Sequence, residues 1–438
     1  MLITTKGVHT VLWKALAAGN IVAGLSIGPV VQAATLEELD KKLTQQAAEM
    51  QALRNELSTL KAEQGKQSTQ VQQQAQVIEQ TQQAGAVAQK TTISSYGEIS
   101  YSRPPKNVRD TQVDVGRAVL GITHRFDEKT KIVAEFEWEH AVTSATDRGE
   151  AAVEQLYVEH ELGNGLKAKG GLFLVPAGLL NTSHEPTAYY GVKRNFVETA
   201  IIPTTWREVG IGLSGTTANS LTWDVGLTTG FDITKWDSNS QDGRDSPLRS
   251  THQEGQLAKA RNLSLYGALN WQAVPGLLLG GSVFSGKAGH NTPNSLLQNS
   301  SVTLFDLHGR YQIGKWDLSA LYARGAISNT DAFNASVAGD PTPIPRNFYG
   351  AYVQAAYKLW KSQAYSLTPF VRYERLNIAK SYSEAALAGG AVVNPDAQIL
   401  TMGANFLIGE GVVLKMDYQK FKQDPTRDRL NLGLGYSF

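Results

Sequence analysis

Alternating hydrophobic and polar positions run through most of the chain, from residue 93 to the last residue, 438. Successive side chains of a β-strand point to opposite faces, so this alternation predicts strands that each have one apolar face. In the final segment the apolar positions are Leu430, Leu432, Leu434, Tyr436 and Phe438. Small or polar residues occupy the positions between them, and the segment is therefore predicted to be a strand that is apolar on one side only.

In several predicted strands the second face carries charge. Between residues 131 and 139, Lys131 and three glutamates alternate with apolar residues, and between 412 and 419 Lys415 and Asp417 do the same. A charged row beside an apolar row does not suit a β-sandwich with a dry core. It suits a transmembrane barrel, which has lipid outside and water inside.

The connections between the strands alternate in length. Seven short turns and eight long polar links imply sixteen strands; the turns fall at 127–129, 163–165, 217–219, 274–276, 314–315, 360–364 and 409–411, and the links at 103–111, 143–150, 176–207, 232–260, 287–301, 326–346, 379–397 and 421–428. The predicted fold is all-β, a sixteen-stranded antiparallel barrel over residues 93–438. A barrel of this size leaves an aqueous channel. Both ends of the barrel fall on the short-turn side, which we expect to be periplasmic.

The first part of the chain follows other patterns. Residues 1–33 have a basic flank, an apolar stretch and a small-residue cleavage site, and are predicted to be a signal peptide; an uncleaved anchor is the alternative. Apolar residues from Leu36 to Leu60 then recur at heptad spacing, which predicts a periplasmic coiled coil over 34–79. The alternative is an amphipathic helix packed on its own domain. Residues 80–92 lack such a period and are predicted to be a linker.

Composition excludes several function classes. The 438 residues include no cysteine, which excludes disulfides and thiolate metal sites, and the net charge of +1 gives no indication of a nucleic acid partner. A mean hydropathy of −0.25 argues against a bundle of transmembrane helices. Neither His spacing nor any other motif indicates a metal or cofactor, and we expect none.

Two stretches resemble a known family. Residues 171–179 and 206–215 resemble the end of strand five and the start of strand six in the phosphate-selective porin (OprO/OprP-like) family, and the N-terminal heptads resemble its DcaP-like, dicarboxylate-porin branch. The pattern Asn431-x-Gly433-x-x-Tyr436-x-Phe438 is also similar to the C-terminal insertion signal of bacterial outer-membrane barrels. The resemblance implies a homotrimer of barrels that pass small anions. The chain departs from the family's arginine ladder, because Glu and Asp share the predicted lumen with Arg and Lys.

The long link after strand five is the candidate for the pore constriction, because in sixteen-stranded porins this loop folds into the barrel. Residues 176–207 mix charge with aromatic and apolar side chains, which indicates packing against the barrel wall. Rings of charge at a constriction set selectivity. The predicted constriction residues are His184, Lys193, Arg194 and Arg207 on the loop, with Lys167, Lys169 and Arg372 on the wall. Alternatively, the three loop cations pair with Glu185, Glu198 and Glu208 and only hold the loop in place.

The sequence therefore predicts an outer-membrane porin for passive diffusion of small hydrophilic solutes, above all anions such as carboxylates or phosphate. The expected partners are outer-membrane lipid, two further copies of the chain and peptidoglycan. The first alternative is a structural anchor or adhesin that uses the coiled coil. The second is a barrel hydrolase built on Ser183, His184 and Glu185, although adjacency in sequence does not create a catalytic triad and no enzymatic activity is expected.

Overall fold

The computed structural model describes residues 40–61, except 42 and 46, and residues 90–438, except 145, 148, 238–242, 244 and 340–342. The chain divides into two units, Met1–Ala88 and Gln89–Phe438. The predicted signal peptide, most of the linker and the outer parts of the predicted coiled coil lie outside the described residues. No helix in the described ranges is long and apolar enough to cross a membrane.

The described part of the first unit is helical at 40–41, 43–45 and 47–61. Its predicted seam residues expose more than half of their surfaces; they are Leu43 (60%), Met50 (59%), Leu53 (64%), Leu57 (55%) and Leu60 (56%). The helix therefore agrees with the first part of the heptad pattern, while its assembly into a coiled coil stays a prediction.

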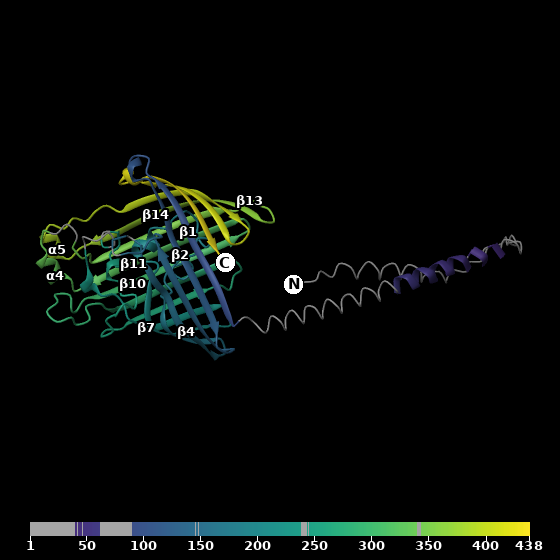
Figure 1. The fold of residues 1–438 in the computed structure, drawn as a ribbon, viewed down its shortest axis with the longest axis horizontal. Coiled ribbons are helices and arrows are strands. Elements are labelled where there is room, and N and C mark those ends of the chain that lie inside the picture. Colours follow the sequence, from purple (N-terminus) through teal and green to yellow (C-terminus); the bar gives the residue numbers. More distant parts are fainter. Residues whose placement is uncertain are drawn as a thin grey trace, which may run out of the picture. The chain divides into compact units, whose positions relative to one another are not determined.

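The second unit is a β-barrel with long, tilted strands (Figure 1). The strands are β1 Thr91–Arg103, β2 Gln112–Arg125, β3 Thr130–Glu139, β4 Ala151–Gly163, β5 Leu166–Leu174, β6 Arg207–Thr216, β7 Leu221–Thr228, β8 Ser264–Trp271, β9 Leu277–Lys287, β10 Ser301–Ile313, β11 Trp316–Ser328, β12 Asn347–Tyr357, β13 Trp360–Lys361, β14 Tyr365–Ser381, β15 Ala397–Ile408, β16 Val412–Phe421 and β17 Arg429–Ser437. The short helices are α4 Asp331–Ser336, α5 Glu384–Ala388, η1 Val108–Asp110, η2 Val197–Ile201, η3 Ile233–Lys235, η4 Arg249–Thr251 and η5 Pro425–Arg427.

The barrel closes because β1 pairs antiparallel with both β17 and β2. Seventeen strands form the sheet, but β13 has only two residues and extends the turn between β12 and β14, which pair directly. Sixteen long strands remain, and the predicted fold is confirmed. The barrel starts at Thr91, two residues before the predicted boundary at 93.

The predicted alternation holds along the strands. In β16, Val413, Lys415 and Asp417 are buried on the inner side, while Leu414 and Met416 expose 42% and 52% of their surfaces on the outer side. All seven short turns lie at one end of the barrel and the long links at the other. We refer to these as the short-turn end and the long-loop end.

The main apolar core lies inside the barrel, where the link between β5 and β6 packs on the wall. Trp206 is fully buried, with its ring centroid 5.0 Å from that of Phe231 and 4.6 Å from that of Phe284. Val197 and Ile201 of η2 are fully buried as well, next to Gly350 of β12. The apolar residues of this loop therefore pack against the wall, as predicted.

Candidate functional site: the loop across the lumen

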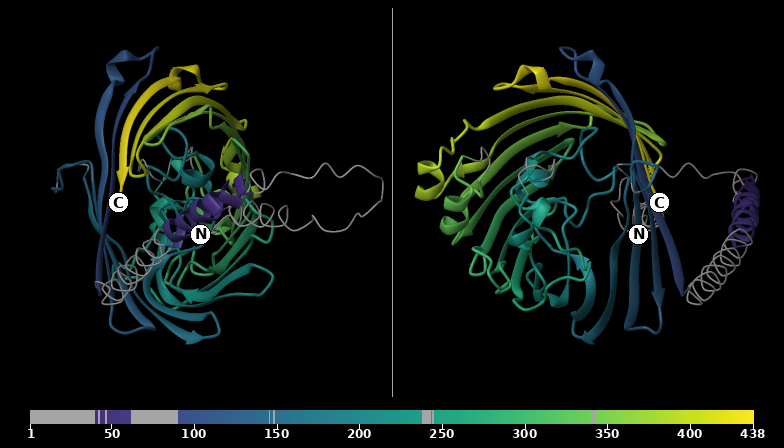
Figure 2. Two further views of the ribbon diagram at one scale, coloured as in Figure 1. Left: turned by 90° about the vertical axis from the view of Figure 1, so that its right-hand side faces the viewer. Right: turned by 60° about the vertical axis from the view of Figure 1, so that its left-hand side comes forward.

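The link 175–206 enters the lumen and crosses it; it is seen inside the ring of strands in Figure 2. A buried carboxylate, Glu198, organises its fold. One Glu198 oxygen accepts hydrogen bonds from the backbone N–H groups of Leu179 (2.6 Å) and Leu180 (2.7 Å). The other accepts from Asn195 Nδ2 (2.8 Å) and the Tyr352 hydroxyl of β12 (3.0 Å). A buried charge is stable only when it is satisfied in this way, so Glu198 fixes the two ends of the loop to each other and to the wall.

The loop is also tied to strands around the barrel wall. Its contacts are Tyr189 hydroxyl to Glu98 of β1 (2.5 Å), Tyr190 hydroxyl to Asp317 of β11 (3.1 Å), Phe196 N–H to Glu374 of β14 (2.6 Å) and Val192 N–H to Asp417 of β16 (2.6 Å). Four carboxylates on the inner wall therefore hold the loop rather than face solute. The sequence had placed two of them, Glu374 and Asp417, in the lumen.

The inner face of β17 lets the loop approach closely, because glycines occupy it. A Cβ at Gly433 would lie 2.9 Å from Val192 Cγ1, and one at Gly435 would overlap Pro186. Contacts this short are essentially never seen for a real Cβ. The small residues of the last strand are therefore a docking surface for the loop, beyond their part in the alternation.

His184, a predicted constriction residue, is buried in the wall contact of the loop. Its Nε2 lies 2.6 Å from the Tyr96 hydroxyl and 2.7 Å from a carboxylate oxygen of Glu154, and its Nδ1 lies 3.1 Å from the Asn181 carbonyl. A carbonyl oxygen only accepts, so Nδ1 carries a proton. Arg117 donates to the His184 carbonyl at 2.5 Å. Both ring nitrogens are engaged, which fits an anchor and leaves neither for Ser183.

Arg372 is a second predicted constriction residue that the structure places in an anchoring position. Its guanidinium lies 2.9 Å from Glu374 and donates to the Tyr190 carbonyl and to Gln354, both at 3.1 Å. Only 2% of Arg372 is exposed. A buried charge pair of this kind orients the backbone of the loop from the wall.

Lys167 and Lys169 lie on the inner face of β5, towards the short-turn end, and the structure does not bring them to the loop cations. Lys169 Nζ is 2.7 Å from Asp224 and 4.4 Å from the centre of the Phe173 ring. Lys167 Nζ is 3.4 Å from Glu159. Both lysines therefore belong to charge pairs of the lumen wall near the short-turn end.

The other three predicted residues come together. Lys193, Arg194 and Arg207 line one cavity of about 600 Å³ between the loop and the wall, on the long-loop side. Arg207 lies 3.1 Å from Glu254, and Arg194 donates to Thr205 Oγ1 at 3.0 Å. Lys193 is exposed and makes no ion pair with any residue of the described ranges. We call this cavity the constriction cavity.

Several residues of the constriction cavity were not predicted to belong to the constriction, although Glu137 and Glu139 were predicted to face the lumen. The link between β7 and β8, residues 229–263, contributes Arg249, His252 and Glu254, while β3 and its link to β4 contribute Glu137, Glu139, His140 and Glu150. Burial alone would raise the pKa of Glu254, but its contacts with His252 and Arg207 lower it, so this carboxylate is ionised. Residues that come from different long links share no local sequence pattern, so the sequence does not show that they are neighbours.

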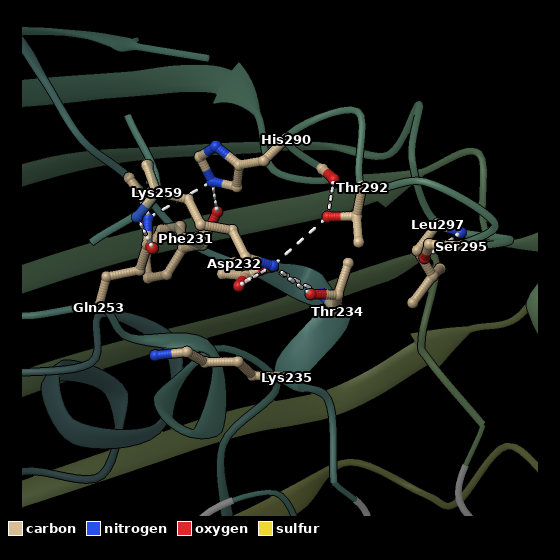
Figure 3. A network of polar contacts seen from close by, with 12 residues as sticks. Phe231, Asp232, Thr234, Lys235, Gln253, Lys259, His290, Thr292, Ser295 and Leu297 are labelled. Carbon is tan, nitrogen blue, oxygen red and sulfur yellow. Dashed lines mark hydrogen bonds and ion pairs between the residues drawn. The ribbon is translucent and has the colours of Figure 1, made fainter. Parts of the chain in front are cut away.

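A polar cluster fixes the position of that second link (Figure 3). Lys259 Nζ lies 2.9 Å from Asp232 and donates to Thr234 Oγ1 at 3.1 Å. His290, on the link between β9 and β10, donates from Nε2 to the Phe231 carbonyl at 3.2 Å. The His290 contact joins two long links, and the Lys259 contacts hold the two ends of the β7–β8 link together.

Known proteins were compared with the chain in sequence and in structure. No protein-family model matches it. An uncharacterised protein of Aquifex aeolicus (strain VF5) is 26% identical over 364 residues, which make up 80% of this chain and 81% of that protein. Salmonella typhi OmpF, solved in complex with daunomycin, is similar with a TM-score of 0.56 and 12% identity, over 80% of this chain and 97% of that chain.

The outer membrane channel DcaP of Acinetobacter baumannii is similar with a TM-score of 0.50 and 11% identity, over 80% of this chain and 97% of that chain. At such identities the likeness establishes the fold, a closed sixteen-stranded barrel of the porin type. The finer resemblance to phosphate-selective porins stays a prediction.

Proposed function

We propose that the protein is a porin of the bacterial outer membrane, through which small hydrophilic solutes diffuse passively. The observation that carries this proposal is the loop across the lumen, which leaves a constriction cavity of about 600 Å³ lined by Lys193, Arg194 and Arg207. A barrel that served only as an anchor would need neither a wide lumen nor a loop tied to strands around its wall. The porin fold of the neighbours agrees with this function.

The proposed solutes are small anions, carboxylates or phosphate. Lys193 has a solvent-exposed ammonium without an ion pair in the described ranges, and Arg194 beside it hydrogen-bonds only to a neutral hydroxyl. Charges at a constriction decide which ions pass. Acidic residues also line the cavity, so the expected preference is for anions in general and not for phosphate alone.

The proposed assembly is a homotrimer, with the coiled coil and both termini in the periplasm. The outer apolar rows of the strands would contact outer-membrane lipid. The exposed heptad leucines of residues 43–60 support self-association, and the coil would bring the protein close to peptidoglycan. The signal peptide over 1–33 is part of the same proposal.

Liposome swelling tests the channel against the anchor alternative. Vesicles containing the purified protein should swell in isosmotic arabinose and swell far more slowly in isosmotic raffinose, because the constriction passes only small solutes. Swelling in neither sugar would contradict the porin proposal and favour the anchor. Equal swelling in both would contradict a constriction by the loop.

A further inference from the structure

The lumen wall carries an apolar patch at the long-loop end of three neighbouring strands. Leu376 of β14, Ile399 of β15 and Phe421 of β16 belong to the inner rows and are 5%, 2% and 4% exposed. Ile399 is paired directly with Phe421 and with the inner-row residue Glu374. Inner rows of a water-filled barrel are ordinarily polar, so three adjacent apolar residues need a cover.

The loop covers only part of this patch. The Phe196 ring meets the Phe421 ring edge-on, with centroids 5.5 Å apart, and η2 packs on β14 beside it. A cavity of about 350 Å³ stays open between them, lined by Phe196, Leu376, Ile399 and Phe421. We call it the vestibule pocket. Its size and apolar walls are those of a small-molecule site.

Arginines lie at the edge of the vestibule pocket. The Arg427 guanidinium carbon is 4.8 Å from the centre of the Phe421 ring, and Arg427 is exposed and forms no ion pair within the described ranges. Arg249 donates to the Thr199 carbonyl at 2.9 Å, and Asp245 is the one carboxylate among the described residues of the lining. An exposed guanidinium over an aromatic wall is complementary to a carboxylate joined to an apolar group.

We propose that the vestibule pocket binds aryl monocarboxylates, with the ring packed on Phe196 and Ile399 and the carboxylate held by Arg427. The inference rests on the proposed porin function, because only a water-filled lumen brings solute to this wall. Dicarboxylates without an apolar body gain nothing from the patch. Cations with an aromatic body are repelled by the guanidinium. The pocket would thus concentrate one class of anion directly above the loop.

Block of single-channel chloride current by 3-phenylpropionate, added on the long-loop side, tests the proposal. Wild-type protein should show concentration-dependent block, and succinate and 3-phenylpropylamine should not block at equal concentrations. Arg427→Gln should weaken the block about tenfold, the effect of removing one charged hydrogen bond. Ala397→Leu, which fills the pocket and leaves Arg427 in place, should weaken it as well. Arg109→Gln, at an exposed arginine of η1, is the matched control and should leave the block unchanged.

Other results would overturn the inference in recognisable ways. A conducting channel without block, or equal losses in the Arg427 and Arg109 variants, would refute the vestibule pocket and leave the porin proposal standing. If the protein does not conduct, the porin proposal fails. Saturation-transfer NMR on the protein in nanodiscs then tests whether the pocket binds 3-phenylpropionate. Transfer to its phenyl protons should occur in the wild type and be lost in the Arg427→Gln and Ala397→Leu variants. Absence of transfer in the wild type would refute it.

Discussion

At the scale of single residues, sequence could not separate the predicted constriction residues that anchor the loop from those that line the constriction cavity. His184 and Arg372 are buried and bind other protein groups with nearly every polar atom, so they act as anchors of the loop. Lys193 and Arg194 face the constriction cavity. The difference arises because burial depends on how the loop folds, and a histidine or arginine looks the same in sequence whether it is held in a wall or exposed.

The His184→Gln variant tests this division. Losing one partner of the buried contact with Glu154 should make local opening of the loop easier by about 3 kcal/mol. Hydrogen exchange of the amides in 176–206 should therefore accelerate. The matched variant Lys193→Gln removes an exposed charge. It should change the free energy of local opening of the loop by less than about 0.5 kcal/mol. Equal exchange in the two variants would contradict the anchoring role of His184.

His290 gives the polar cluster between two long links a pH dependence. Burial lowers the pKa of His290, and its buried Nδ1 has no hydrogen-bond partner among the described residues. The folded cluster therefore prefers the neutral ring, while the unfolded chain takes up a proton near pH 6.5. The cluster should be fully stable above about pH 6.5 and lose stability as the pH falls from there towards the lowered pKa.

Amide exchange of residues 229–263, corrected for the intrinsic rate, measures this effect. The protected amides should open more readily at about pH 5 than at about pH 7.5, and His290→Gln should remove the difference. A pH-independent exchange in the wild type, or an unchanged difference in the variant, would contradict the assignment to His290.

At the scale of elements, the last strand has two functions. Its outer face is part of the apolar surface of the barrel, and its inner face contacts the loop. The alternation of β17 was predictable, because the face of a strand residue depends only on its position in the strand. The docking of the loop on Gly433 and Gly435 was not, because it depends on two segments far apart in the chain. The same holds for the constriction cavity, which combines β3, the crossing loop and the link between β7 and β8.

The Gly435→Val substitution should push the loop from the β17 wall towards the centre of the lumen. A side chain at this position would overlap Pro186. The expected result is a lower single-channel conductance from a barrel that still assembles. Leu434→Val, on the outer face of the same strand, is the control and should conduct as the wild type does. An unchanged conductance in Gly435→Val would show that the loop does not rest on this strand.

At the scale of the whole molecule, the barrel was predictable to a large degree. Strand number, the alternating faces and the lengths of the links follow from local patterns, and they differ from the structure mainly in the start of β1 at Thr91 and in the length of the β7–β8 link. Assembly could not be predicted as closely as the barrel. The exposed leucines of the N-terminal helix indicate that it packs against a partner, but they do not identify that partner.

The double variant Leu53→Asn, Leu57→Asn addresses assembly. Polar residues at the predicted seam should lower the temperature at which the proposed trimer dissociates on a semi-native gel, and the conductance of each barrel should stay the same. Gln51→Asn, off the seam of the same helix, should have no effect. Dissociation at the wild-type temperature in the double variant would contradict a trimer held by the coil.

The reversal potential of the purified protein in a planar bilayer under a potassium chloride gradient tests whether Lys193 and Arg194 make the channel anion-selective. We predict anion selectivity in the wild type and a marked loss of that selectivity in the variant Lys193→Gln, Arg194→Gln. Lys129→Gln, in a short turn away from the lumen, should keep the wild-type value. Cation selectivity in the wild type, or a double variant as anion-selective as the wild type, would contradict a constriction governed by these two residues.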